Sequence, residues 1–197
     1  MPKLFIIAGC NGAGKTTASY TILPDMLNCE EYVNADEIAK GLSPFNPSLV
    51  AIKASRIMME RIEELIEKGG DFGIETTLAT RSLSRVVVRA QEKGYFVTVV
   101  FFWLRLPELA VERVKLRVAS GGHDVPEKTI VRRYGVGIDN LFRLYIPICD
   151  YWIIIDNSNS PSRITAEGGK SIVTKIHNKT AYNLLLNYER TRDEGAS

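Results

Sequence analysis

The 197-residue sequence has few cysteines, little net charge and no long apolar run, and each shortage excludes a class of protein. The three cysteines are odd in number and widely spaced, which argues against a disulfide framework or a metal-binding pattern. A formal net charge of +2 gives no reason to expect a nucleic-acid or membrane partner. No apolar stretch approaches the roughly 20 residues of a membrane span, and no signal-peptide pattern precedes the first apolar run. We therefore expect a cytoplasmic globular protein.

The strongest motif is Gly9-Cys10-Asn11-Gly12-Ala13-Gly14-Lys15-Thr16, which matches the phosphate-binding loop pattern G-x-x-x-x-G-K-[ST]. The motif follows the apolar run 4–8 and precedes a helix-compatible stretch, which is the context in which backbone N–H groups cradle phosphates. The Lys15 amine is expected to reach the β- and γ-phosphates, and the Thr16 hydroxyl is expected to ligate Mg²⁺. The residues predicted to contact the phosphates of ATP are Asn11, Gly12, Ala13, Gly14, Lys15, Thr16 and Thr17.

Apolar runs alternate with longer amphipathic segments, a pattern typical of a parallel sheet covered by helices. We predict an α/β fold of the P-loop NTPase, kinase-like type, with a mainly parallel five-stranded sheet. The predicted strands lie near residues 3–8, 31–34, 72–75, 95–103 and 150–155. The predicted helices lie near residues 15–27, 48–68, 80–93, 107–119 and 126–146.

The pattern changes after Asn157, where a polar loop precedes a predicted β-hairpin over 163–176 and a helix near 179–190. No linker is long enough to divide the chain. We therefore expect one P-loop kinase domain over 1–197, with a lid at about 113–133 and a small hairpin-plus-helix appendage at about 159–197.

Other patterns narrow the class of nucleotide-binding protein. Asn178-Lys179-Thr180-Ala181 lacks the aspartate with which switch GTPases bind guanine, and no second signature of a transport ATPase is visible. The nearest Walker-B-like carboxylate, Asp156, comes late, on the last parallel strand. A compact kinase remains, in which Mg²⁺ rests on Thr16, the phosphates and water, with Asp36 or Glu75 as a further ligand.

Carboxylates follow the second and third predicted strands. We expect the end of the second strand beside the phosphate loop, where Asp36 can take a proton from an acceptor hydroxyl. Asp36 or Asn34 can equally cap the following helical turn. Glu75 and Thr76, at the end of the third strand, can bind a polyhydroxylated acceptor or a magnesium-bound water. Thr76, Thr77 or Thr80 also fits a helix N-cap.

Arginines cluster in the predicted lid. Arg113 and Arg117 lie four residues apart on one helix face, where like charges repel unless they face an anion. The turn 121–122 joins that helix to the one carrying Arg132 and Arg133, so the two helices can close over a triphosphate. An arginine there can neutralise charge on the transferring phosphoryl group. A solvated helix face is the alternative, and we favour it for Arg113.

These residues together resemble the zeta-toxin family of small P-loop kinases, particularly the branch described as predicted ABC-type ATPases. The matching segments, spread over residues 1–158, are the phosphate loop, Asn34-Ala35-Asp36, Ile74-Glu75-Thr76-Thr77-Leu78, Arg113-Val114, Arg117-Val118, Gly121-Gly122-His123-Asp124-Val125-Pro126, Ile130, Arg132-Arg133-Tyr134 and Asp156-Asn157-Ser158. The resemblance implies that ATP phosphorylates a sugar hydroxyl, which in characterised zeta toxins belongs to UDP-N-acetylglucosamine. An antitoxin protein is the macromolecular partner that it implies.

By position, the resemblance makes Asp36 the general base, Glu75 a substrate-binding carboxylate and Arg117 a lid arginine acting on the phosphates. The predicted catalytic residues are therefore Lys15, Asp36 and Arg117, and the predicted acceptor-binding residues are Asp36, Glu75 and Thr76. Where the family has a second lid arginine, this chain has Gly-Gly-His-Asp. Arg132 or Arg133 is expected to replace that charge at the phosphates, and we choose Arg133.

Two other functions stay open. The acceptor can instead be another small metabolite or a nucleic-acid end, although no basic strip interleaved with aromatic residues supports the latter. The chain can also be an ATP-binding toxin or regulatory module that acts through a partner protein, although its complete set of site residues argues against a degenerate site.

Overall fold

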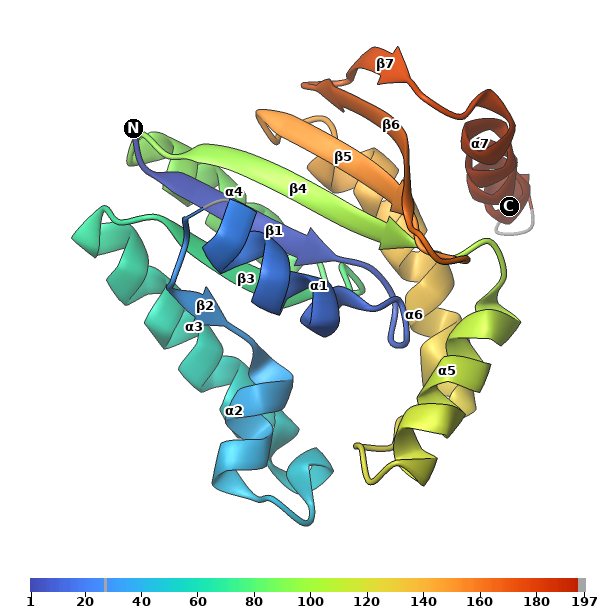
Figure 1. Ribbon diagram of the computed structural model, residues 1–197. Coiled ribbons are helices and arrows are strands. Elements are labelled where there is room, and N and C mark those ends of the chain that lie inside the picture. The colour runs from blue at the N-terminus through green and yellow to red at the C-terminus, as the bar shows by residue number, and fades with distance from the viewer. Residues whose placement is uncertain (27, 195–197) are drawn as a thin grey trace.

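The computed structural model describes residues 1–26 and 28–194 and has helices on both faces of a seven-stranded sheet (Figure 1). The strands are β1 (Lys3–Ala8), β2 (Tyr32–Val33), β3 (Phe72–Thr76), β4 (Phe96–Trp103), β5 (Tyr151–Asp156), β6 (Arg163–Gly169) and β7 (Ile172–Ile176). The α-helices are α1 (Lys15–Thr21), α2 (Ala35–Leu42), α3 (Ala51–Lys68), α4 (Ser82–Glu92), α5 (Pro107–Ala119), α6 (Glu127–Asn140) and α7 (Lys179–Glu194). No helix in this described part of the chain is both long and apolar enough to cross a membrane.

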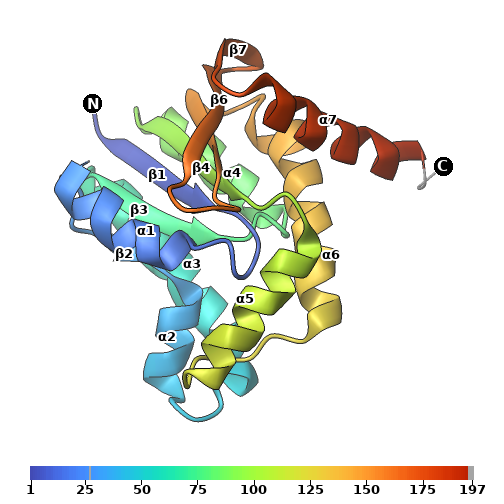
Figure 2. The ribbon, with the colours of Figure 1, turned by 45° about the vertical axis from the view of Figure 1, so that its right-hand side comes forward.

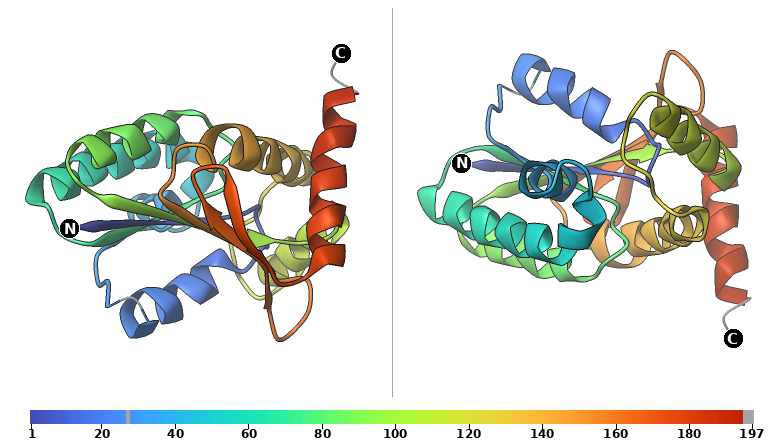
Figure 3. Two further views of the ribbon diagram at one scale, coloured as in Figure 1. Left: turned by 90° about the horizontal axis from the view of Figure 1, so that it is seen from above. Right: turned by 90° about the horizontal axis from the view of Figure 1, so that it is seen from below.

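The sheet order is β2-β3-β1-β4-β5-β6-β7, and the first five strands run parallel. The predicted α/β class and parallel sheet are thus confirmed. Helices α1 and α5 cover one face, and α3, α4 and α6 cover the other (Figure 3). This double cover explains why β1 and β4 are almost wholly apolar, because a strand buried on both faces cannot alternate polar and apolar side chains.

Strand β3 lies between β2 and β1 in the sheet, so the second strand is not a direct neighbour of the phosphate-loop strand. In the β1–β3 register Ile7 is opposite Glu75 and Ala8 is opposite Thr76. The carboxylate nearest the start of the phosphate loop in the sheet is therefore Glu75, and Asp36 reaches the site from one strand further away.

Helix α2 was not among the predicted helices. It begins directly after Asn34, whose side-chain oxygen accepts a hydrogen bond from the N–H of Asp36 at 2.8 Å. Asn34 is therefore the N-cap, which was one of the two capping candidates. The Asp36 side chain lies in the first turn and does not cap the helix. The predicted helix at 15–27 divides into α1 and a π-helical turn, Ile22–Met26, while Leu27 lies outside the described residues.

The predicted hairpin is continuous with the main sheet. Strand β6 pairs antiparallel with β5, and β7 pairs antiparallel with β6, so the C-terminal segment extends the sheet by two strands. Helix α7 then packs against β6 and α6, where the rings of Tyr134 and Tyr188 meet edge to face at 5.2 Å (Figure 2). Residues 195–197 of the predicted appendage lie outside the described residues.

Candidate active site

The phosphate loop joins β1 to α1 and is held open for phosphate by its glycines and by two hydrogen bonds. Gly14 has a φ of 86°, and a Cβ atom there would lie 2.5 Å from Nδ2 of Asn157, so only glycine fits. The same Asn157 amide donates to the carbonyl of Ala13 at 2.8 Å. Inside the loop, Nζ of Lys15 donates to the carbonyl of Cys10 at 3.0 Å. The loop is thus shaped before any ligand binds.

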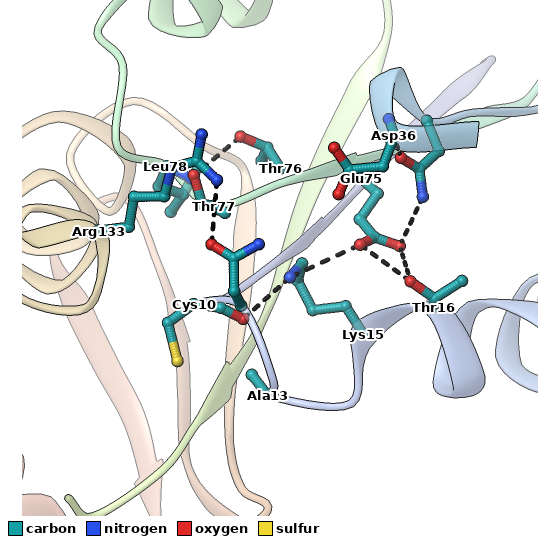
Figure 4. Close-up of polar contacts among 12 residues, drawn as sticks. Cys10, Ala13, Lys15, Thr16, Asp36, Glu75, Thr76, Thr77, Leu78 and Arg133 are labelled. Atoms are coloured by element: carbon teal, nitrogen blue, oxygen red, sulfur yellow. Dashed lines mark hydrogen bonds and ion pairs between the residues drawn. The ribbon is translucent and has the colours of Figure 1, made fainter. Parts of the chain in front are cut away.

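The Glu75 carboxylate is the centre of the polar network beside this loop (Figure 4). Its two oxygens accept the Thr16 hydroxyl at 3.1 and 2.9 Å, and Oε1 lies 3.6 Å from Nζ of Lys15. The hydroxyl of Tyr32 and the amide of Asn34 donate to Oε2, the amide at 3.1 Å. Burial, and secondarily the charge of Glu75, raises the pKa of Tyr32, so its phenol stays a donor to the carboxylate. Four side chains therefore fix one carboxylate.

Tyr32 is a site residue that the sequence analysis missed. It precedes Asn34 by two positions on β2, so both side chains point to the same face and reach across to β3. The only local sign of a role for Tyr32 was its place in a short strand, and a tyrosine in a strand is more often a core residue. Its contact with Glu75 becomes visible only when β2 and β3 are known to be neighbours.

Oxygen ligands suited to Mg²⁺ meet where Thr16 approaches Glu75. Hydroxyl and carboxylate oxygens are the groups that a magnesium ion prefers, and its remaining positions are commonly filled by phosphates and water. Among the described residues no group of three or more His, Cys, Asp or Glu could hold a metal without such help. The residues therefore fit a magnesium ion that arrives with a nucleotide, and they do not fit a resident metal centre.

The Walker-B-like carboxylate Asp156 has a different role. Its Oδ2 accepts a hydrogen bond from Nε of Arg105 at 2.8 Å, and its Oδ1 accepts the N–H of Ser158 at 3.0 Å. Although burial opposes it, these partners keep the pKa of Asp156 below its usual value. Arg113 is half-buried and donates to the carbonyl of Ser158 at 3.2 Å, so the solvated face expected for it was wrong. Both groups shape the loop that follows β5.

A cavity of about 410 Å³ opens from the phosphate loop between the two helix pairs. Lys15, Asp36 and Glu75 line its inner end, together with Thr76 and Arg133. The far wall comes from α3, the β3–α4 turn and the segment between α5 and α6. Figure 1 shows α2 with α3 and α5 with α6 extending on either side of the sheet's carboxyl edge. Five of the twelve predicted site residues thus line one cavity.

The β3–α4 turn lines the cavity and also contacts α6. Thr76 and Thr77 accept hydrogen bonds from the N–H groups of Leu78 and Ala79 at 3.0 and 3.4 Å. Helix α4 begins at Ser82 after Arg81 and has no side-chain cap, so none of Thr76, Thr77 and Thr80 caps it, and that alternative was wrong. Leu78 is fully buried with a φ of 54°, and the amide of Asn140, at the end of α6, donates to its carbonyl at 2.6 Å. The lid helix is thereby tied to the turn.

The lid arginines divide into one that reaches the site and others that do not. Nη1 of Arg133 donates to Oδ1 of Asn11 at 3.1 Å, directly over the phosphate loop. Burial lowers its pKa, opposed by the charge of Asp36. Arg132 is exposed, and Arg117 does not line the cavity, because its guanidinium donates to the carbonyl of His123 at 2.8 Å. The structure therefore brings Arg133 to the loop, while Arg117 braces the lid turn.

Fold and site together define a class. A phosphate loop that enters a helix, with the neighbouring parallel strand supplying a carboxylate, is the arrangement of P-loop kinases, and this chain is one of these phosphotransferases. The zeta toxin family model matches residues 1–144, so the chain belongs to the zeta toxin family. The resemblance read from the sequence is confirmed, and the loop is a nucleotide-binding site.

Several relatives and structures are similar to the chain. An uncharacterized protein of Haemophilus influenzae is 30% identical over 132 residues, which cover 67% of this chain and 92% of that protein. A chain of the AvrRxo1-ORF1:-ORF2 complex with ATP aligns over 94% of this chain with a TM-score of 0.75 and 16% identity, and this chain spans 63% of it. A chain of the PezAT toxin-antitoxin system of Streptococcus pneumoniae aligns over 98% of this chain and 87% of its own, with a TM-score of 0.65 and 16% identity. At these identities the two structures establish the fold alone.

Proposed function

We propose that the protein is an ATP- and Mg²⁺-dependent kinase that transfers the γ-phosphoryl group to a hydroxyl of a small acceptor in the cavity. The observation that carries this proposal is the convergence of Lys15, Asp36 and Arg133 on one cavity, although they come from α1, α2 and α6. Binding of ATP alone does not need a free carboxylate opposite the phosphate-binding lysine. Transfer to a hydroxyl does need one.

The donor half uses the phosphate loop and the lid. Lys15 and the loop N–H groups bind the β- and γ-phosphates, while Thr17, exposed in the first turn of α1, is near enough along the chain to bind the next phosphate. Mg²⁺ supplies charge neutralisation at the phosphates, and Thr16 and Glu75 would hold it. Arg133 takes the place of the second lid arginine. Arg117 would reach the phosphates only after the lid closes.

The acceptor half uses Asp36. The carboxylate removes the acceptor's hydroxyl proton as the acceptor oxygen forms its bond to the γ-phosphorus. The bond between that phosphorus and the β–γ bridging oxygen breaks, and ADP leaves with the electron pair. Thr76 and Glu75 line the same end of the cavity and orient the acceptor. Family membership makes a nucleotide sugar, such as UDP-N-acetylglucosamine, the first acceptor to test.

We also propose an antitoxin as the protein partner. The PezAT neighbour belongs to a toxin-antitoxin system, and the AvrRxo1 neighbour was solved as a two-protein complex. Growth arrest on expression of the wild type, abolished in Asp36→Asn, supports a toxin whose effect depends on phosphoryl transfer. Growth arrest that persists in Asp36→Asn favours a module that acts through its partner instead.

The direct test compares Asp36→Asn with Glu37→Gln, which removes a neighbouring carboxylate that pairs with Lys40. Labelled ATP is incubated with a panel of sugar nucleotides, sugars and oligonucleotides, and MgATP binding is measured by calorimetry. Loss of general-base catalysis lowers transfer by roughly 10²- to 10⁴-fold. We expect that loss in Asp36→Asn with MgATP binding retained, and wild-type transfer in Glu37→Gln. Undiminished transfer in Asp36→Asn removes Asp36 from the mechanism.

A further inference from the structure

The two oxygens of the Glu75 carboxylate have different partners. Oε2 accepts the hydroxyl of Tyr32 and the amide of Asn34, the amide at 3.1 Å. Oε1 lies 3.6 Å from Nζ of Lys15, and the Thr16 hydroxyl donates to both oxygens, at 3.1 Å to Oε1 and 2.9 Å to Oε2 (Figure 4). One set of donors therefore comes from β2 and the residue just after it, and the other comes from the first turn of α1.

The two sets of donors respond differently to a nucleotide. Lys15 and Thr16 are the groups that bind the phosphates and their metal ion, so MgATP takes both away from the carboxylate. Tyr32 does not line the cavity, so no ligand there competes for its hydroxyl. The amide of Asn34 also donates to that hydroxyl, at 3.2 Å, which leaves the phenolic hydrogen for Glu75. The contact between Tyr32 and Glu75 is thus the one that nucleotide binding leaves in place.

We propose that Tyr32 is a positioning residue for Glu75, whose hydroxyl holds Oε2 so that Oε1 stays directed at the metal ion that the phosphates carry. A carboxylate as buried as Glu75, at 9% exposure, needs hydrogen-bond donors in every state of the site. Without the Tyr32 hydroxyl, Glu75 would depend more on Lys15 and Thr16 and would compete with the nucleotide for them. The proposal rests on the proposed function, because it concerns the same magnesium site.

The test removes the hydroxyl and keeps the ring. Tyr32→Phe retains the edge-to-face contact with Tyr20, whose ring centroid lies 6.0 Å away. Calorimetry with EDTA, and again with excess Mg²⁺, gives the Kd of metal-free ATP and of MgATP. We expect both to be weakened by about fivefold to tenfold, because a hydrogen bond to a charged group matters more once two other donors have left. Wild-type affinity for both forms in Tyr32→Phe overturns the proposal, even if Tyr32→Leu binds poorly, because the ring alone would then matter.

A double-mutant cycle tests whether the hydroxyl acts through the carboxylate. If it does, adding Tyr32→Phe to Glu75→Gln changes MgATP affinity by less than about twofold. Full additivity of the two effects overturns the proposal. Tyr20→Phe is the matched control, because it removes an exposed hydroxyl from the neighbouring ring and is expected to bind as the wild type does. A loss in Tyr20→Phe equal to that in Tyr32→Phe also overturns the proposal.

The cycle also covers a folding defect. If Tyr32→Phe does not fold, folding of the double variant with Glu75→Gln supports the proposal, because the hydroxyl is then needed only beside a charged carboxylate. Failure of the double variant as well shows a purely structural tyrosine and overturns it.

These measurements separate the positioning role from the proposed kinase. Phosphoryl transfer by the wild type without coupling between Tyr32 and Glu75 overturns the positioning role and leaves the kinase intact. Coupling in nucleotide binding without transfer to any acceptor supports the positioning role and contradicts the kinase. A wild type that does not bind MgATP contradicts both.

Discussion

Replacing Glu75 with glutamine tests whether this carboxylate belongs to the magnesium site. The carboxylate oxygens accept the Thr16 hydroxyl at 2.9 and 3.1 Å, and Oε1 lies 3.6 Å from Nζ of Lys15. Glu75 therefore occupies the two groups that MgATP needs. Without Mg²⁺, the carboxylate repels the phosphates. With Mg²⁺, it attracts the ion that the phosphates carry, so the variant is expected to affect ATP and MgATP in opposite directions.

The magnitude follows from the distances. At an effective dielectric constant of about 20, unit charges 3.6 Å apart attract by about 5 kcal/mol before desolvation, and the repulsion between the carboxylate and a phosphate bound at Lys15 is of the same order. Desolvation of the buried charges offsets a large part of both figures, leaving about 1 to 2 kcal/mol. Each 1.4 kcal/mol is a factor of ten in affinity. We expect Glu75→Gln to bind metal-free ATP about tenfold more tightly and MgATP about tenfold more weakly.

Isothermal titration of ATP with EDTA, and again with excess Mg²⁺, measures both dissociation constants. The informative quantity is the ratio of the metal-free Kd to the MgATP Kd, which should fall by roughly 100-fold in Glu75→Gln. Glu31→Gln is the control, because Glu31 pairs with Arg61 outside the cavity. A wild-type ratio in Glu75→Gln would show that Glu75 senses neither the metal nor the phosphates, and the proposed magnesium site would be wrong.

Four further outcomes are expected. Arg133→Ala should weaken MgATP binding by about tenfold, the value of one charged hydrogen bond, whereas Arg132→Ala should not, and equal effects would remove Arg133 from the donor site. Arg117→Ala should lower turnover with little change in MgATP affinity, since its contact is the lid carbonyl of His123; an equal loss of affinity would mean that it touches the phosphates. Burial raises the pKa of the Cys10 thiol to about 11, and all three cysteines are buried, so a disulfide reagent at pH 8 should label the native protein far more slowly than the denatured one. The pKa of Cys10 in the folded protein exceeds the unfolded value of 9.0, so the neutral thiol contributes fully to stability below pH 9. This contribution is lost as the pH rises through about 11. Chemical unfolding at pH 8 and 10.5 would measure the loss.

Much of the donor site could be predicted because its chemistry is local. The sequence 9–16 contains the glycines, the lysine and the hydroxyl within eight residues, and the structure keeps all of them in one turn between β1 and α1. Gly14 illustrates the reason, since a φ of 86° favours glycine there and strains any other residue. The strands and long helices were predictable for a similar reason, because apolar periodicity depends on neighbours along the chain.

The acceptor side could be predicted only in part. Asp36 was a candidate from its place after a strand, but Asn34 fitted the capping role as well as Asp36 did, and the capping hydrogen bond decides between them. Tyr32 was missed altogether, because its partner Glu75 is 43 residues away in sequence. The choice between Arg132 and Arg133 depends on which face of α6 turns toward Asn11. Local sequence does not show this, because Asn11 and Arg133 are 122 residues apart.

The sequence by itself determined that residues 9–16 form a phosphate-loop motif and that a parallel sheet carries this loop. Only the tertiary structure decided which carboxylate stands beside it. Strand order depends on how the crossover helices pack, which residue-by-residue periodicity does not encode. Because β3 lies between β1 and β2, Glu75 meets Lys15 and Thr16, while Asp36, which follows β2, lines the cavity. The different surroundings of the two carboxylates are therefore a property of the fold.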